Sequence, residues 1–130
     1  MASIDNYLAV HANAIKLRSK RAELIAGNLA NADTPGYRPR DINFAAAMKA
    51  ATSVGSAQMS TTHSKHIPLR SHAAGTRTLY RDSPQGSLDE NSVDSELERT
   101  KFADNDVRYQ ASVQFISGRV NSLLRALRGE

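Results

Sequence analysis

The chain has 130 residues with no Cys and no Trp, and its 17 Lys and Arg exceed its 13 Asp and Glu to give a net charge of +4. The lack of cysteine excludes a disulfide framework, a thiolate zinc site and a cysteine nucleophile. No apolar run approaches the roughly 18 residues of a membrane span, and the first residues lack the basic and apolar regions of a cleaved secretory signal, so we expect neither.

The first 31 residues predict one long helix. Apolar side chains recur at alternating steps of four and three residues, and neither Pro nor Gly occurs before Gly27, which is the pattern of one helical stripe. On this stripe we assign helix packing to Leu8, Ile15, Ile25 and Leu29. The basic residues at positions 16, 18, 20 and 21 spread around the helix. They favour a solvated face, or an acidic neighbour such as residues 89–106, over nucleic acid.

A helix stop follows between Gly27 and Tyr37. Thr34 precedes a proline and is thereby pushed toward extended backbone, and Pro35-Gly36 suits the centre of a type II turn. Asn28 and Asn31 lie three residues apart on one helical face, which is more than a stop requires. Their amides suit hydrogen bonds either to a neighbouring chain or to the backbone of the loop.

The middle of the chain is polar and carries no sign of catalysis. Its prolines and glycines and a short alternating stretch at residues 76–80 predict loops with a short β-hairpin. Since no acidic residue accompanies His63, His66 and His72, we interpret them as solvent-exposed rather than as a metal site. Phosphate-binding glycine loops, zinc-protease motifs and nucleophile elbows do not occur in the sequence. We therefore expect no enzyme, no cofactor and no metal.

The last part of the chain has the clearest periodicity. Residues 89–106 carry seven acidic and two basic residues and precede a basic segment, which suits the dipole of a helix. Apolar side chains then follow a strict alternation of four and three residues at Tyr109, Val113, Ile116, Val120, Leu123 and Leu127. The sequence thus predicts a mainly α chain with long terminal helices. These helices must bury their stripes against each other or against other molecules.

Two motifs resemble the bacterial flagellar rod and hook protein family. The first is Asn28-Leu29-Ala30-Asn31 followed by Thr34-Pro35-Gly36-Tyr37, which is similar to the family's N-terminal signature. The second, at residues 87–96, and the helix that continues through residues 105–112 resemble the proximal rod members. Glu90 stands where this motif often has Gly, and this difference affects only the local geometry of the turn.

The resemblance implies a structural subunit of the proximal rod, in a drive shaft that crosses the periplasm and transmits torque for motility. Its terminal helices would pair as an antiparallel coiled-coil-like core, formed by residues 1–33 and 89–130 around a turn, loop and hairpin region at 34–88. The rest of each stripe would pack on copies of itself or on other rod proteins, and further contacts would reach the inner-membrane (MS) ring and the rod-base adaptor.

The resemblance also implies export through the flagellar type III gate. This gate reads a Phe followed four residues later by an apolar residue. Phe44 and Met48 fit that spacing, although the pattern is so loose that chance alone would produce such a match equally often. The alternative is a soluble two-helix secretion chaperone or a needle-type subunit, although a needle subunit would be shorter and would lack both motifs.

Overall fold

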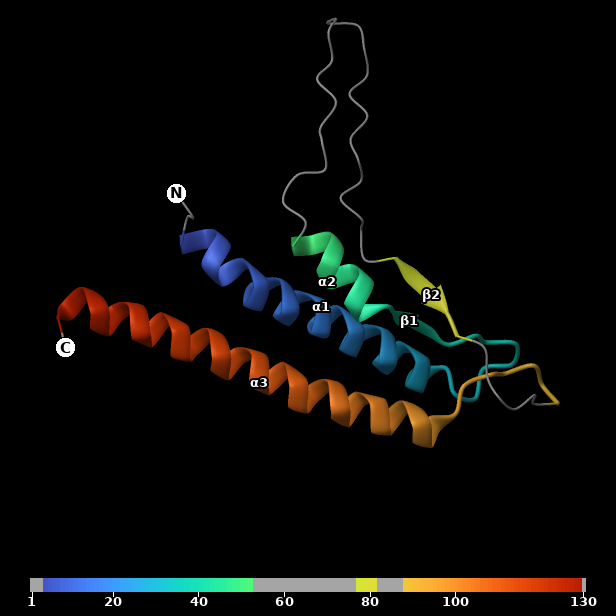
Figure 1. Ribbon diagram of the computed structural model, residues 1–130. Helices are drawn as coiled ribbons and strands as arrows, with labels where there is room; N and C mark the ends of the chain where they lie inside the picture. Colours follow the sequence, from blue (N-terminus) through green and yellow to red (C-terminus); the bar gives the residue numbers. More distant parts are fainter. Residues whose placement is uncertain (1–3, 53–76, 82–87, 130) are drawn as a thin grey trace, which may run out of the picture.

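The computed structural model describes residues 4–52, 77–81 and 88–129 (Figure 1). Its elements in chain order are α1 (Ile4–Ala30), β1 (Arg40–Ile42), α2 (Phe44–Thr52), β2 (Thr78–Tyr80) and α3 (Ser95–Arg128). The two long helices α1 and α3 run antiparallel side by side, as Figure 1 shows, and α2 lies along α1. The predicted mainly α fold with paired terminal helices is confirmed.

Both ends of α3 are capped in the ways that the sequence favours. The carboxylate of Asp94 accepts hydrogen bonds from the backbone N–H of Glu96 (3.0 Å) and Leu97 (3.1 Å) at the first turn. At the other end Gly129 adopts a left-handed backbone with φ of 76° and donates to the carbonyl of Arg125. At 34 residues α3 is longer than the 27 residues of α1, and its last turns extend past the start of α1 (Figure 1).

The predicted turn after α1 is confirmed. The helix ends at Ala30, and the N–H of Tyr37 donates to the carbonyl of Thr34 at 3.3 Å. Between them Gly36 has φ of 70°, which is the value that the third position of a type II turn requires and that glycine adopts without strain.

Two smaller elements lie on the helix pair. The strands β1 and β2 pair antiparallel, with Arg40 opposite Tyr80 and Ile42 opposite Thr78. The alternating stretch thus forms a strand at Thr78–Tyr80, but its partner is the distant segment Arg40–Ile42 before α2. The helix α2 begins where Asn43 Oδ1 accepts from the N–H of Ala46 at 3.0 Å. This helix is not among the elements predicted from the sequence, because nine residues with only two large apolar side chains are too few to define a period.

The core contains little apolar bulk. Among the described residues the buried hydrophobic side chains are Leu17, Ile25 and Ile42, and a larger set of polar side chains is buried beside them. These polar residues are Asn28, Asp41, Asn91, Glu98, Asn105 and Ser112. Since buried polar groups are stable only when they are hydrogen-bonded, the fold depends on how these six residues are paired. No helix within the described ranges is long and apolar enough to span a bilayer.

Candidate assembly surface

The side chain of Asn28 joins three elements at the end of α1. Its Nδ2 donates to the carbonyl of Arg40 on β1 (2.8 Å) and to Oε2 of Glu98 on α3 (2.9 Å), while its Oδ1 accepts from the N–H of Arg40 (2.9 Å). The side chain is fully buried, with 0% of its surface exposed. Of the two alternatives for its amide, the structure thus shows hydrogen bonds within the chain.

Beside Asn28 lies a chain of alternating charges formed by Arg21, Asp41, Arg81 and Glu98. We call these four residues together with Asn28 the junction network. Arg21 on α1 makes two hydrogen bonds to Asp41 on β1, at 2.9 and 3.0 Å. Arg81, directly after β2, lies 3.7 Å from Asp41 and donates to both oxygens of Glu98 at 2.7 and 2.9 Å. The network thereby ties both strands to both long helices.

Charge pairing accounts for the stability of this network. Glu98 is only 1% exposed, and a buried carboxylate requires a cation and further donors, which Arg81 and Asn28 supply. The hydrogen bond to Asp41 raises the pKa of Arg21 above its ordinary value, so the guanidinium stays charged at any physiological pH. The sequence favours solvent or an acidic neighbour such as residues 89–106 for the basic residues of α1, and the hydrogen-bonded neighbour of Arg21 is another acidic residue, Asp41.

The turn after α1 is held by a second set of hydrogen bonds. Asn31 Nδ2 donates to the carbonyl of Gly27 at 2.8 Å, and Asn31 Oδ1 accepts from the hydroxyl of Thr34 at 3.2 Å. From the segment before α3, the buried Asn91 donates to the carbonyls of Asn31 and Ala32. The N–H of Gly36 reaches the carbonyl of Asp89 at 2.9 Å. The turn and the start of α3 therefore form one folded unit.

The signature residues differ in how far they are covered. Asn28 is buried, whereas Leu29, Asn31 and Tyr37 are half-buried. The others face solvent in this chain, and they are Ala30, Thr34, Pro35 and Gly36. The exposed part of the signature is thus the outer side of the turn.

Polar side chains occupy the centre of the contact between α1 and α3. Arg18 Nε donates to the hydroxyl of Ser112 at 3.2 Å, and Asn105 Nδ2 donates to the carbonyl of Arg18 at 3.0 Å. The Arg18 guanidinium also lies over the ring of Phe44 on α2, 4.4 Å from its centre. Burial lowers the pKa of Arg18, and the like charge of Arg108 adds to this effect.

The apolar residues assigned to packing fall into two groups. Ile25 is buried, and the half-buried members lie along both helices at Leu8, Ile15, Leu29, Tyr109, Ile116 and Leu123. The remaining ones, Val113, Val120 and Leu127, are exposed, and Leu127 keeps 85% of its surface. In α2 Phe44 and Met48 are half-buried.

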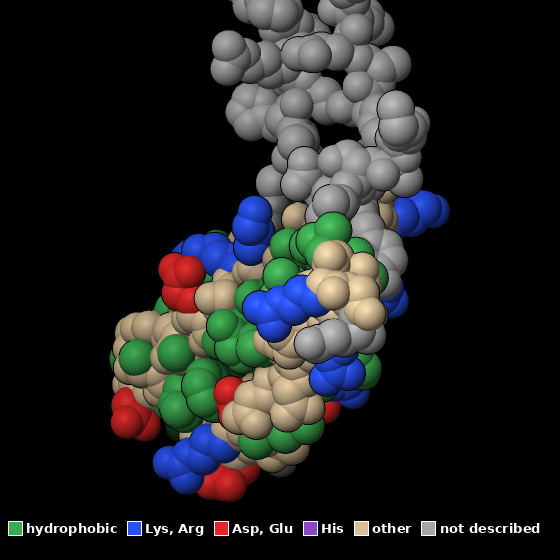
Figure 2. Space-filling view, turned by 90° about the vertical axis from the view of Figure 1, so that its left-hand side faces the viewer, with side chains coloured by type: hydrophobic (Ala, Val, Ile, Leu, Met, Phe, Trp, Pro, Cys, Tyr) green, Lys and Arg blue, Asp and Glu red, His purple; other side chains and the backbone are tan. Residues whose placement is uncertain are grey.

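Four exposed apolar residues of the second half of α3 share one side of the helix, while the exposed Phe115 lies on another side. Val113, Val120, Leu124 and Leu127 follow one another at steps of seven, four and three residues, which returns to the same side. We call these four residues the C-terminal apolar strip. Figure 2 looks at the end of the molecule where α1 begins and α3 ends, and it shows hydrophobic side chains on the surface with charged ones around them.

Most of the junction network has no signal in the sequence. By sequence alone Glu98 is one of several acidic residues before a basic segment, and Arg81 belongs to the polar loop region. Their distance of 17 residues in sequence offers no periodic signal. Within the described ranges the acidic residues and His11 form no cluster that could hold a metal ion, and the three histidines of the middle region lie outside those ranges.

Comparisons with known proteins agree with the resemblance noted in the sequence. The sequence pattern of the family described as "Flagella basal body rod protein" matches residues 8–38. The flagellar basal body rod protein FlgB of Aeromonas hydrophila is 43% identical over 129 residues, which cover 98% of this chain and 97% of the relative. The FlgB proteins of Proteus mirabilis and Escherichia coli are each 42% identical, over 95% of this chain and 95% and 94% of their own lengths.

Proposed function

Because this chain belongs to the flagellar basal body rod protein family, we propose that it joins neighbouring rod subunits through the C-terminal apolar strip of α3. As a member it is a structural subunit of the basal body rod, it associates with other rod components, and it is not an enzyme. The secretion chaperone and the needle subunit are not favoured, since the rod relatives match nearly its full length.

The observation that carries the proposal is the exposure of apolar side chains in the last turns of α3. Glu98, Asn105 and Ser112 are buried along the earlier part of the helix, whereas Leu124 and Leu127 keep 44% and 85% of their surface. Apolar surface removed from water stabilises a contact by about 25 cal/mol per Å². A contact that uses different surfaces on the two subunits builds a helical rod when its rotation does not close into a ring.

The assembly role of the strip can be tested with Leu124→Gln, which removes apolar surface without adding charge. We expect this variant to lose swimming and complete rods, while the purified chain melts at an unchanged temperature because Leu124 contributes little to the fold. Val107→Gln is the matched control, since Val107 is also exposed and apolar but lies on another side of α3. Normal rods from Leu124→Gln, or an equal loss from Val107→Gln, would contradict the proposal.

We further propose that the signature supports assembly by fixing the turn rather than by direct contact through Asn28. Its hydrogen bonds to β1 and α3 support this role, as does its complete burial. The three parts at residues 1–33, 34–88 and 89–130 then act as sections of one unit. Within the rod we place the subunit in the proximal part, where it crosses the periplasm and transmits torque.

The contacts with the MS ring, the rod-base adaptor and further copies of this chain are also part of the proposal. Because the sequence has no cysteine, a single cysteine at Leu127 provides a unique cross-linking site in assembled basal bodies. We expect cross-links to rod, ring or adaptor proteins. A cross-linked product that contains none of these proteins would argue against this placement.

Export through the flagellar type III gate is proposed to depend on Phe44 and Met48. Both side chains are half-buried against α1 in the folded chain, so the gate would read them before the chain folds. We expect Phe44→Ala and Met48→Ala each to lower the amount of exported protein severalfold, whereas Lys49→Ala, exposed on the same helix, leaves export unchanged. Equal export of all three variants would exclude this role.

A further inference from the structure

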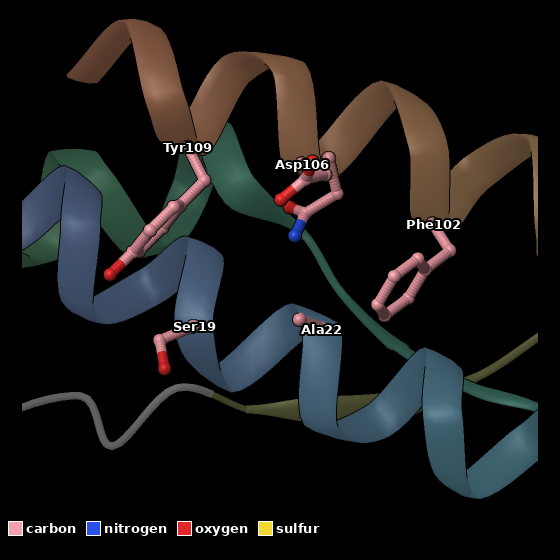
Figure 3. Close-up of a pocket in the computed structure, with 6 residues that line it drawn as sticks. Ser19, Ala22, Phe102, Asp106 and Tyr109 are labelled. Carbon is pink, nitrogen blue, oxygen red and sulfur yellow. The ribbon is translucent and has the colours of Figure 1, made fainter. Parts of the chain in front are cut away.

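A pocket of about 160 Å³ opens between α1 and α3 beside the C-terminal apolar strip. Figure 3 shows Phe102 and Tyr109 projecting from α3 with Asp106 between them, and Ser19 and Ala22 opposite on α1. The hollow exists because two large rings, seven residues apart on one helix, face two small side chains on the other. Since Phe102 and Tyr109 precede Val113 at steps of seven and four residues, the pocket continues the strip toward the junction.

Asn105 also lines the pocket and has an unused hydrogen-bond acceptor. The residue is 1% exposed, and its Nδ2 is taken up by the carbonyl of Arg18. Its Oδ1 is buried and has no hydrogen-bond partner among the residues that the structure describes. A buried acceptor without a donor destabilises the protein. This atom therefore indicates that a side chain bound in the pocket ends in an N–H or O–H group.

The charge of the pocket and the side chains that line it further indicate which type of side chain could bind there. Ser19 and Asp106 add a hydroxyl and a carboxylate to its polar groups, and no Lys or Arg lines it. Asp106 already accepts from Gln110 at 2.8 Å through one oxygen, which leaves acceptor sites on the carboxylate. The rings of Phe102 and Tyr109 suit the methylene stem of a long side chain and, at their faces, a cation.

We propose that this pocket receives a lysine or arginine side chain of a neighbouring rod subunit, whose N–H groups bond Asn105 and Asp106. The inference rests on the proposed function, because it requires a subunit seated along α3. It adds a specific basic anchor to contacts that are otherwise apolar. Such an anchor would fix the position of the neighbour along the helix, which a uniform apolar strip does not determine.

The first test fills the pocket. Ala22→Phe places a ring where the occupant would lie, and Ala103→Phe is the control, because Ala103 is exposed on α3 and does not line the pocket. We expect Ala22→Phe to lose complete basal bodies and swimming while its purified chain keeps the helical circular dichroism of the parent. Swimming equal to that of Ala103→Phe would overturn the proposal.

The second test removes the charge without changing shape, and it decides the matter if Ala22→Phe does not fold. Asp106→Asn is compared with Asp104→Asn, which lies two residues away and pairs with Arg108 outside the pocket. We expect several times fewer complete basal bodies per cell for Asp106→Asn and no change for Asp104→Asn. Equal numbers for the two variants would exclude a basic occupant.

A strain without the gene separates failure of this inference from failure of the proposed function. If that strain builds no rods but the pocket variants build them normally, only the pocket inference is wrong. If the deletion strain still builds complete rods, the proposed function itself fails. A photo-reactive phenylalanine at Ser19, at the pocket, then identifies by mass spectrometry whether a copy of this chain or another rod protein supplies the side chain. A cross-link to a protein outside the rod would overturn the inference.

Discussion

The two ends of the helix pair are built on opposite principles. At the junction, polar side chains from α1, β1, α3 and the residue after β2 are buried and paired with one another. At the far end, the C-terminal apolar strip remains exposed. Hydrogen bonds require strict geometry, and those of the junction are made within one chain, whereas an apolar surface can pack against many partners. We infer that the junction determines the fold of the subunit and that the far end is available for assembly.

The largest expected effect comes from breaking the junction at Glu98. Glu98→Ala leaves the Arg81 guanidinium, in a largely buried site, with only the more distant carboxylate of Asp41, and loss of one member of a buried pair costs about 3 kcal/mol. Urea unfolding followed by circular dichroism measures this loss. Glu96→Ala removes a comparable but exposed ion pair with Arg99, which is worth about 0–1 kcal/mol. Equal losses in the two variants would show that the junction network is not what stabilises the subunit.

A smaller effect is expected from the amides of the signature. Asn28→Ala leaves the carbonyl and N–H of Arg40 without their side-chain partner in a buried site, for a loss of about 2 kcal/mol. Asn31→Ala removes hydrogen bonds at a half-buried position, for a loss of about 1 kcal/mol. Thermal or urea unfolding measures the loss of unfolding free energy in each variant. A larger loss for Asn31→Ala than for Asn28→Ala would contradict the conclusion that Asn28 joins the three elements.

The smallest effect concerns Glu90. It lies between Asp89 and Asn91, which both hydrogen-bond the turn after α1. Its φ of 58° is left-handed, and this backbone conformation costs a non-glycine residue about 1–2 kcal/mol of stability. A glycine avoids that cost but loses about 0.5–1 kcal/mol, because its unfolded chain has greater conformational freedom. Glu90→Gly should therefore stabilise the chain by about 0.5 kcal/mol. Glu90→Ala retains the strained backbone and should bring no gain, and a stabilised alanine variant would refute this explanation.

The features that sequence alone could predict are local. The stripe of α3, the proline-glycine turn and the long first helix each depend on residues within a few positions of one another. The resemblance also marked Glu90 as standing where glycine is usual, and the structure shows the left-handed backbone that gives glycine its place there. These features need no knowledge of which segments meet.

The features that sequence could not predict depend on segments that meet only in the fold. Asn28 and Glu98 lie 70 residues apart in sequence, and nothing periodic connects them. Arg18 was interpreted as one basic residue on a solvated helix, yet its guanidinium lies over Phe44 and bonds Ser112. The apolar ladder predicts packing between the helices and on neighbouring molecules, but it gives no sign of the polar residues Asn105 and Ser112 that lie buried between the helices.

The antiparallel arrangement has a practical consequence for labelling this subunit. The start of α1 and the last turns of α3 lie at the same end of the molecule, away from the junction (Figure 1). A fluorescent protein or an affinity tag fused at either terminus would therefore crowd the side of Leu124 and Leu127, where neighbouring subunits are proposed to bind. The solvent-facing residues Thr34 and Pro35, at the other end, offer a place for a small dye that leaves this surface accessible.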